Sequence, residues 1–271
     1  MQHIPRKRFG QHFLHERGVI TRIVDELDLQ ANDLVVEIGP GLGALTDYLL
    51  PKLDHLHVVE LDRDLAKLLR ERHAADKLTV HEGDALEFDF AQFGQAIRLV
   101  GNLPYNISTP LLFHFAKFRS LLRDGHFMLQ REVVDRMVAA PSSAAYGRLS
   151  VSLQLDFEMK SLFRIGPGAF TPAPKVESAI VRLIPLPENP FDLHDRDLFA
   201  AIVNRAFTQR RKTLRNSLRD YLSPEDFANV DIDPMARAEN LGVSDYVRIS
   251  NMVALRGNGP RPRSTRAGLQ A

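Results

Sequence analysis

Two short motifs carry the residues of this chain that could do chemistry. The tetrapeptide Asn102-Leu103-Pro104-Tyr105 closes an apolar run, and Glu37-Ile38-Gly39-Pro40-Gly41-Leu42-Gly43 lies upstream of it. Asparagine offers a side-chain carbonyl, leucine offers a backbone carbonyl held extended by the following proline, and tyrosine offers a flat ring for stacking. An exocyclic aromatic amine needs such oxygen acceptors, because its N–H groups become more acidic as the nitrogen attacks a methyl group. The two motifs together suggest methyl transfer to an amine of this kind.

The glycine motif predicts a sharp turn from a strand into a helix, where the backbone approaches a ligand. Glu60 ends the next apolar run, where a carboxylate can accept hydrogen bonds from ribose hydroxyls. Both features also suit a nicotinamide dinucleotide, because Ala44 satisfies the third position of that fingerprint. The tetrapeptide favours a methyl donor, since hydride transfer requires no paired carbonyl acceptors beside a ring.

Asp84 follows a third apolar run, in Glu82-Gly83-Asp84-Ala85. A polar side chain at that edge of a sheet could hold the amino group of a cofactor adenine. The alternative is an aspartate that caps a helix or closes a turn.

These motifs need a sheet that brings the ends of several strands together. The hydrophobic pattern predicts helices at 16–29, 44–53, 64–73 and 109–118, and strands at 34–38, 56–61, 78–82 and 97–101. Later segments at 126–130, 151–158 and 176–184 read as strands that end the sheet in an antiparallel hairpin. The alternation is typical of right-handed crossovers in a doubly wound α/β sheet.

The proline-rich stretch before Phe191 separates this alternation from a region of helices only. We therefore expect a basic N-terminal arm at 1–15, a methyltransferase domain at 16–189, a small all-helical domain at 190–256 and a disordered basic tail at 257–271.

Composition excludes several classes of protein. The hydrophobic fraction of 44% and the charged fraction of 25% are those of an ordinary globular protein, and no cysteine is present. Disulfides, thiolate catalysis and cysteine-based metal sites are therefore impossible. The N-terminus lacks a signal-peptide pattern and no uncharged run is long enough to span a membrane. We expect a cytoplasmic protein without a membrane partner.

The net charge of +1 hides an uneven distribution. The segments 1–15, 205–219 and 256–271 contain thirteen of the 35 basic residues and no acidic residue, which leaves 22 basic against 34 acidic residues elsewhere. One such segment could be a solvated face, or could bind the acidic body of its own chain. Three together favour a polyanion such as nucleic acid.

The chain resembles the adenine N6,N6-dimethyltransferases of small-subunit (16S) ribosomal RNA. Seven blocks carry the resemblance in order along the sequence: Arg8–Leu14, Glu37–Gly43, Glu60–Asp62, Gly83–Ala85, Gly101–Tyr105, Phe170–Val176 and Ala206–Leu214. Histidine stands at position 12, where the family often has asparagine. The resemblance implies a class I methyltransferase fold and S-adenosylmethionine as cofactor, with no metal.

The resemblance also assigns roles in the cofactor site. Gly39 and Gly41 would lie beside the methionine part of the cofactor, Glu60 on its ribose and Asp84 on its adenine. The N-terminal arm would close the site through two further residues, His12 and Leu14, and Asn102 would contact the cofactor as well.

For the RNA, the resemblance makes Asn102, Leu103, Pro104 and Tyr105 the catalytic residues. Tyr105 would stack on the target adenine and Phe170 would cover its other face or its edge, although a buried loop anchor is the alternative for Phe170. The basic residues expected to bind RNA phosphates are Arg210, Arg211, Lys212 and Arg215. The implied partner is 16S rRNA in the small subunit or its precursor, and we expect a monomer.

The expected mechanism is a direct displacement at the sulfonium methyl, in which positioning and electrostatics carry the rate and no strong general base is needed. Three alternatives stay open. One is a large-subunit rRNA methyltransferase that confers antibiotic resistance, and another is an adenine N6 DNA methyltransferase. The third is a ribosome-assembly factor that does not catalyse methylation.

Overall fold

The computed structural model of this protein describes residues 12–256. The chain forms two compact units. The first unit consists of Met1–Asp135 and Phe157–Pro185, and the second consists of Arg136–Asp156 and Leu186–Ala271. Each unit has its own hydrophobic core.

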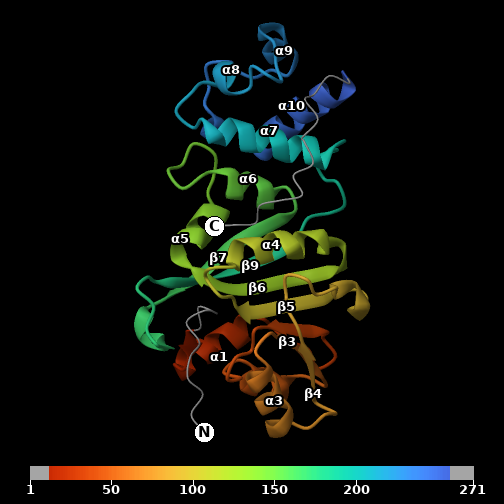
Figure 1. Cartoon of the computed structure of the whole chain (residues 1–271), viewed down its shortest axis with the longest axis vertical. Helices are drawn as coiled ribbons and strands as arrows, with labels where there is room; N and C mark the ends of the chain where they lie inside the picture. Colours follow the sequence, from red (N-terminus) through yellow and green to blue (C-terminus); the bar gives the residue numbers. More distant parts are fainter. Residues whose placement is uncertain (1–11, 257–271) are drawn as a thin grey trace. The chain divides into compact units, whose positions relative to one another are not determined.

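The first unit is built on a seven-stranded sheet (Figure 1). Its strands are β2 (Val35–Ile38), β3 (Leu56–Glu60), β4 (Leu78–Glu82), β5 (Ile97–Asn102), β6 (Leu122–Gln130), β7 (Phe157–Ile165) and β9 (Ser178–Pro185). They lie in the order β4-β3-β2-β5-β6-β9-β7. The strands from β4 to β6 are parallel, whereas β9 is antiparallel to both of its neighbours. The predicted α/β class and the antiparallel end of the sheet are confirmed.

Within residues 12–256, five helices accompany these strands, and acidic side chains cap two of them. They are α1 (Arg17–Glu26), α2 (Thr46–Leu49), α3 (Arg63–Arg72), α4 (Ser108–Lys117) and α5 (Arg131–Met137). Glu16 accepts hydrogen bonds from two backbone N–H groups at the start of α1, and Asp62 accepts one at the start of α3. Single turns of 3-10 helix lie at Leu50–Lys52, Phe90–Phe93, Arg119–Leu121 and Pro167–Ala169. A separate two-stranded sheet pairs β1 (Phe13–Leu14) with β8 (Phe170–Thr171).

The centre of the sheet fixes the two sequence motifs next to each other. All four residues of β2 are buried, as expected for a parallel strand that is covered on both faces. On the neighbouring β5, a Cβ atom at Gly101 would lie only 2.5 Å from the carbonyl oxygen of Ile38. Glycine at this position therefore lets β5 approach β2 closely, so that the glycine turn and the tetrapeptide leave the same edge of the sheet.

Up to Arg256, where the described part of the chain ends, the second unit is helical apart from one isolated bridge between Thr213 and Arg237. Its helices are α6 (Arg148–Gln154), α7 (Arg196–Thr208), α8 (Leu214–Ser217), α9 (Pro224–Asn229) and α10 (Val243–Leu255), with a 3-10 turn at Ala238–Asn240. Helices α7 and α10 pack side by side (Figure 1). Two buried tyrosines tie this core together, because Tyr146 donates to the carbonyl of Leu241 and Tyr246 donates to that of Ala238.

The predicted strand at 151–158 is wrong. Residues 148–154 form α6, and the strand begins only at Phe157. The sequence Val-Ser-Leu-Gln-Leu alternates as a strand does, but Val151 and Leu155 are one helical turn apart and both belong to the core of the second unit. Tertiary packing on α7 therefore overrides the local alternation.

The chain also divides differently from the predicted single boundary at residue 189. Residues 136–156 join the C-terminal helices instead of the sheet, and the second segment of that unit starts at Leu186. Asp156 explains the connection, since its carboxylate pairs with Arg196 at 2.6 Å and its carbonyl accepts a hydrogen bond from the backbone of Leu186. Most of the expected basic arm and the whole of the expected tail lie outside the described residues.

Candidate active site

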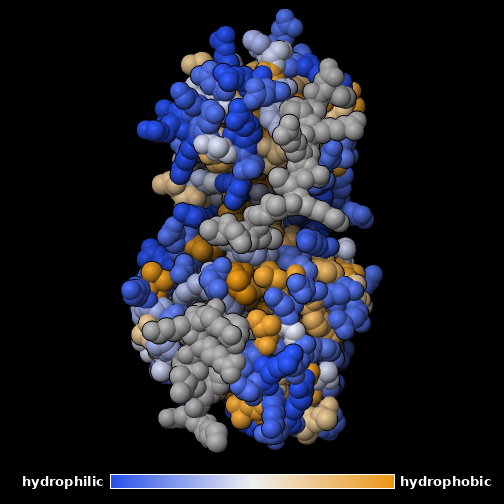
Figure 2. Space-filling model, viewed as in Figure 1, coloured by the Kyte–Doolittle hydropathy of each residue, from blue (hydrophilic) through white to orange (hydrophobic). Residues whose placement is uncertain are grey.

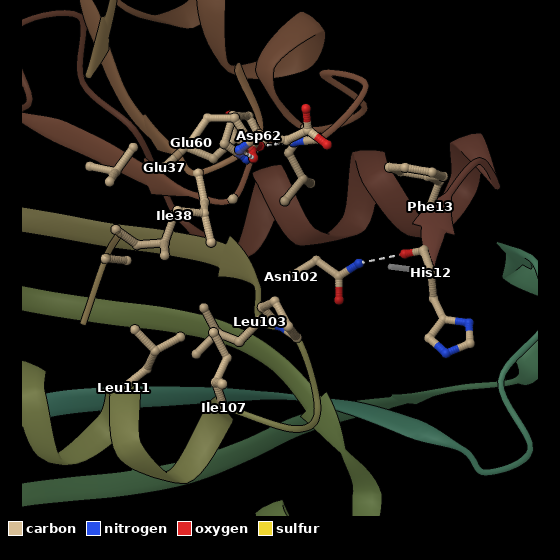
Figure 3. A pocket seen from close by; sticks show the side chains of 18 of the residues that line it. His12, Phe13, Glu37, Ile38, Glu60, Asp62, Asn102, Leu103, Ile107 and Leu111 are labelled. Atoms are coloured by element: carbon tan, nitrogen blue, oxygen red, sulfur yellow. Dashed lines mark hydrogen bonds between the residues drawn. The ribbon is translucent and has the colours of Figure 1, made fainter. Parts of the chain in front are cut away.

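A cavity of about 250 Å³ lies at the carboxyl ends of the parallel strands, within the first unit (Figure 3). Its lining comes from His12–Leu14, Glu37–Leu42, Ala44–Leu45, Val59–Asp62, Gly83–Leu86, Asn102–Ile107 and Leu111. Every predicted cofactor-binding residue and the whole predicted tetrapeptide are among these residues. The structure therefore brings together five segments that were predicted to form one site: the arm, the glycine turn, Glu60, Asp84 and the tetrapeptide.

The glycine turn has the backbone conformation that its sequence predicts. Gly39 and Gly41 have φ angles of +63° and +59°, a region that residues with a Cβ atom rarely adopt. A Cβ atom at Gly41 would also lie 3.1 Å from the ring of Phe13, whereas one at Gly39 would meet nothing within 4 Å. The turn thus combines one position packed against the arm with one position open to a ligand.

Glu60 is held rigidly at the end of β3. One of its carboxylate oxygens accepts a hydrogen bond from the backbone N–H of Gly41 at 3.0 Å, and the other accepts one from that of Asp62 at 2.8 Å. Burial raises the pKa of Glu60, while the backbone hydrogen bonds oppose this shift. The side chain lines the cavity with both oxygens oriented by main-chain donors, as a receptor for hydroxyl groups requires.

Asp84 lines the cavity as predicted, but its side chain already closes a local turn. Its Oδ1 atom accepts a hydrogen bond from the backbone N–H of Leu86 at 2.9 Å. Both interpretations of this residue therefore agree with the structure, since one carboxylate oxygen forms the turn and the residue still borders the cavity.

Asn102 is oriented by the arm. Its amide nitrogen donates a hydrogen bond to the backbone carbonyl of His12 at 2.9 Å (Figure 3). Because that partner can only accept, the amide must present its NH2 group there and keep its carbonyl oxygen for another donor. In Figure 3 Asn102 lies between the side chains of Glu60 and Asp62 on one side and those of Ile107 and Leu111 on the other.

The rest of the tetrapeptide is fixed by backbone hydrogen bonds. Leu103 is buried, and its N–H donates to the carbonyl of Met128 at 3.1 Å. The carbonyl of Pro104 accepts from the N–H of Ile107, again at 3.1 Å. The turn is therefore a rigid continuation of β5 rather than a mobile loop.

Tyr105 is held at its hydroxyl and stacked on its ring. Its hydroxyl lies 2.6 Å from Oγ of Ser178, and its ring centroid lies 5.6 Å from that of His12 at an interplanar angle of 27°. His12 donates from Nδ1 to the carbonyl of Pro172 at 2.7 Å. Burial raises the pKa of Tyr105, so the phenol stays neutral near pH 7 and acts as a flat, uncharged ring.

The structure does not bring Phe170 to the cavity. This residue is 3% exposed, pairs with Leu14 between β8 and β1, and belongs to the core of the first unit. Phe170 is therefore a buried anchor of its loop, which was the alternative to a contact with the adenine. Leu14 is part of the same core but also lines the cavity, as predicted.

The predicted basic residues lie in the second unit and differ in their partners. Arg210 pairs with Glu239 at 2.7 Å, whereas Arg211, Lys212 and Arg215 are exposed and have no acidic partner within residues 12–256. The first three of these residues lie in a turn after α7, which ends at Thr208, and Arg215 lies in the short α8. The face of α7 and α8 seen in Figure 2 is mainly hydrophilic, as exposed cations require.

Sequence reasoning assigned no role to several residues of the cavity. Phe13 packs on the glycine turn, and Ile107 and Leu111 form an apolar wall. Their signals are weak, because apolar residues beside a motif are usually core. Glu37 is different, since it is a carboxylate inside the apolar strand Val-Val-Glu-Ile. That contrast could have marked it as a candidate.

Comparisons with known proteins agree with this geometry. The model of the family described as "Ribosomal RNA adenine dimethylase" matches residues 2–255. "Ribosomal RNA small subunit methyltransferase A" of Nitrosospira multiformis is 59% identical over 93% of this chain and 97% of its own length, and that of Aromatoleum aromaticum is 56% identical over 93% and 96%.

The solved dimethyladenosine transferase of Plasmodium falciparum has a TM-score of 0.80 at 26% identity, and the match covers 91% of this chain and 99% of that one. The sheet is that of a class I methyltransferase. Since the cavity, the tetrapeptide and nearly the whole sequence agree, the chain belongs to the ribosomal RNA adenine dimethylase family.

Proposed function

We propose that this chain uses S-adenosylmethionine to dimethylate the N6 amines of two adjacent adenines in a hairpin loop near the 3′ end of 16S rRNA. The observation that carries this proposal is the orientation of Asn102, whose carbonyl oxygen receives no hydrogen bond within residues 12–256 and which lines the same cavity as Tyr105. The names of the curated relatives support the small-subunit RNA over a large-subunit or DNA substrate.

The residues of the cavity fit the cofactor. S-adenosylmethionine carries an adenosine, a sulfonium and an amino-acid group. The two buried carboxylates, Glu37 and Glu60, suit hydroxyl and cationic groups, while the apolar side chains of Ile107 and Leu111 suit the adenine ring. Gly39 leaves open space where a backbone has to approach a ligand. When bound, the cofactor supplies an activated methyl group on a positively charged sulfur.

The remaining chemistry falls to the tetrapeptide. The carbonyl oxygens of Asn102 and Leu103 accept hydrogen bonds from the N6 hydrogens, and these bonds strengthen as the nitrogen becomes electron-poor. Tyr105 stacks on the adenine and sets the direction in which N6 points. The methylated nitrogen releases its proton to water, so no general base is required. One hydrogen remains after the first transfer, which permits a second transfer to the same nitrogen.

The target adenine has to leave its stack to reach such a cavity, at a cost of a few kcal/mol that is smallest in a loop. Stacking on Tyr105 returns about 1–3 kcal/mol. Arg211, Lys212 and Arg215 are suited to phosphates, because no acidic side chain in the described part of the chain neutralises them. We expect the enzyme to act as a monomer in the cytoplasm, on the small subunit or its precursor.

The proposal is tested with labelled methyl groups. Wild-type protein is incubated with S-adenosylmethionine and unmethylated small subunits, and the nucleosides are analysed by mass spectrometry. Dimethylated adenosine should form, and Asn102→Ala should form far less of it while still binding the subunit. Large subunits and duplex DNA serve as competing substrates. Methylation of either in preference to the small subunit would contradict the proposed substrate, and binding without methylation by the wild type would indicate an assembly factor.

Among the described residues, no helix has both the length and the apolar character needed to cross a membrane.

A further inference from the structure

Two buried carboxylates share the cavity but are held very differently. Glu37 is 2% exposed and Glu60 is 5% exposed, and within residues 12–256 neither pairs with a basic side chain. Glu60 accepts backbone hydrogen bonds on both of its oxygens. Glu37 receives one hydrogen bond, from the hydroxyl of Thr46 to Oε2 at 2.6 Å. Glu37 is therefore the carboxylate whose negative charge is less well supported by the protein's own groups.

The elements packed against Glu37 offer it no positive charge. Its neighbours in the sheet are Val58 on β3 and Val100 on β5, which are apolar and buried. Helix α2 contributes the neutral Thr46 and the acidic Asp47. Asp47 itself contacts Arg72 and His73, so these basic side chains are engaged by Asp47 and not by Glu37. The other ionisable groups that line the cavity are His12, Glu60, Asp62, Asp84 and Tyr105.

These surroundings keep a proton on Glu37. Burial raises the pKa of Glu37 to about 8, and the neighbouring charges of Glu60 and Asp47 act in the same direction against the hydrogen bond from Thr46. Near pH 7 the side chain is then mostly neutral. A positive charge brought into the cavity would reverse the preference, because it stabilises the ionised form.

We propose that Glu37 couples its own ionisation to the charge of the cofactor. Glu37 is protonated before the cofactor binds and releases its proton to water when S-adenosylmethionine binds. The site therefore binds the methyl donor more tightly than the demethylated product. The methyl donor has a positively charged sulfur, and the product has a neutral thioether in its place. This inference rests on the proposed function and concerns one residue of the same site. The only covalent change is a proton transfer, in which the O–H bond of Glu37 breaks and a new O–H bond forms on the accepting water molecule.

The sign of the pH dependence follows from this coupling. Below the pKa of about 8, binding of the cation has to remove a proton, so the affinity for S-adenosylmethionine should rise with pH. Between pH 7 and pH 8 the rise should be about fivefold, which is the increase in the ionised fraction of a group with that pKa. The affinity for the neutral thioether product should rise less over the same interval.

Calorimetry measures this coupling without methyl transfer. The full chain is titrated with S-adenosylmethionine, and separately with S-adenosylhomocysteine, at pH 7 in buffers that differ in ionisation enthalpy. We expect close to one proton released for the methyl donor and clearly fewer for the product. Glu37→Gln should release no proton on binding, because glutamine keeps an acceptor for Thr46 but cannot ionise. The ratio of the affinities for S-adenosylmethionine and S-adenosylhomocysteine should also become smaller in this variant.

Glu71→Gln is the matched control, since Glu71 is an exposed carboxylate on α3 away from the cavity. It should leave the proton release unchanged. If Glu37→Gln does not fold, an infrared difference spectrum of the wild type should show a protonated carboxyl band disappearing when S-adenosylmethionine is added.

Binding without proton release, or an unchanged release in folded Glu37→Gln, would overturn the coupling alone. No binding of S-adenosylmethionine to the wild type would overturn the proposed function together with it.

Discussion

The side-chain amide of Asn102 donates a hydrogen bond to the backbone carbonyl of His12, although ninety residues separate the two in sequence. The partner is a main-chain atom, so the side chain at position 12 does not decide how the amide is oriented. Histidine where the family often has asparagine therefore keeps this interaction. What the histidine ring adds is the contact with Tyr105 and the hydrogen bond to Pro172.

Replacing Asn102 should stop catalysis without preventing RNA binding. We expect Asn102→Ala to lower single-turnover methyl transfer by about 10²–10³, the usual effect of losing one oriented polar group at a reacting centre. His12→Ala keeps the backbone carbonyl and should have a smaller effect. Rates with saturating cofactor measure the difference, and an equal loss in both variants would contradict the role of the amide carbonyl.

The ring and the hydroxyl of Tyr105 should be separable. Tyr105→Phe removes the hydrogen bond to Ser178 and should cost about 1 kcal/mol of stability, with most activity retained. Tyr105→Ala removes the stacking surface and should weaken the productive binding of RNA by about 1–3 kcal/mol. Denaturant unfolding and methylation kinetics on the same proteins test this. Equal activity of the two variants would show that stacking is unimportant.

The two glycines of the turn should respond differently to alanine. Both have positive φ, so each substitution should cost about 1–2 kcal/mol of stability. Gly41→Ala additionally drives a methyl group against Phe13, whereas Gly39→Ala meets open space in the protein itself. We expect Gly41→Ala to move Phe13, seen as a changed ring spectrum in the cofactor-free protein. An identical spectrum in both variants would argue against the predicted clash.

Arg211 and Arg215, which have no acidic partner within residues 12–256, should contribute strongly to the salt dependence of RNA binding. Arg211→Ala combined with Arg215→Ala should lower the slope of log affinity against log salt by about 1.4–1.8, since each phosphate contact contributes about 0.7–0.9. Arg205 is the control, because it already pairs with Asp220 at 2.7 Å. Arg205→Ala should change the slope little. A slope unaffected by the double replacement would remove these residues from the RNA interface.

Stability should fall in mild acid because of His126. This histidine is 2% exposed, and neither ring nitrogen has a hydrogen-bond partner in the described part of the chain. Burial lowers its pKa from 6.5 to about 4, so the unfolded chain takes up a proton at a higher pH than the folded chain. Its stabilising contribution is therefore present above pH 6.5 and is lost as the pH falls toward 4.

The expected loss between pH 7 and pH 5 is about 2 kcal/mol. Urea unfolding at both values measures it, and His126→Leu should remove this part of the pH dependence. If the variant loses as much stability as the wild type between the two values, other groups are responsible.

The parts of the first unit that could be predicted are those determined by residues close together in the sequence. Short apolar strands followed by glycine or acidic turns identified β2, β3 and β4, and the Asn-Leu-Pro-Tyr turn identified β5. The carboxyl ends of parallel strands necessarily meet at one edge. That rule was enough to gather Gly39, Glu60, Asp84 and Asn102 in one cavity.

What could not be predicted depends on distant partners. The segment around Val151 alternates like a strand and becomes a helix because α7, more than forty residues later, covers it. A phenylalanine can line a ligand site or a hydrophobic core, and the sequence does not distinguish the two. For Phe170 the pairing of its strand with Leu14 places the ring in the core. The protonation of Glu37 likewise depends on distant partners, because neither the neighbouring strands nor α2 places a positive charge beside it and Thr46 gives it a single hydrogen bond.

The insertion of residues 136–156 into the helical unit has a consequence for biosynthesis. These residues leave the ribosome before Phe157–Pro185, which complete the sheet, and well before α7 and α10, which complete their own core. The apolar face of α6 therefore stays exposed to solvent until about fifty further residues have been synthesised. This number is the sequence separation between Val151 on α6 and Val203 on α7. A nascent chain stalled before α7 should thus bind chaperones through this segment, and release of the full length should end that binding.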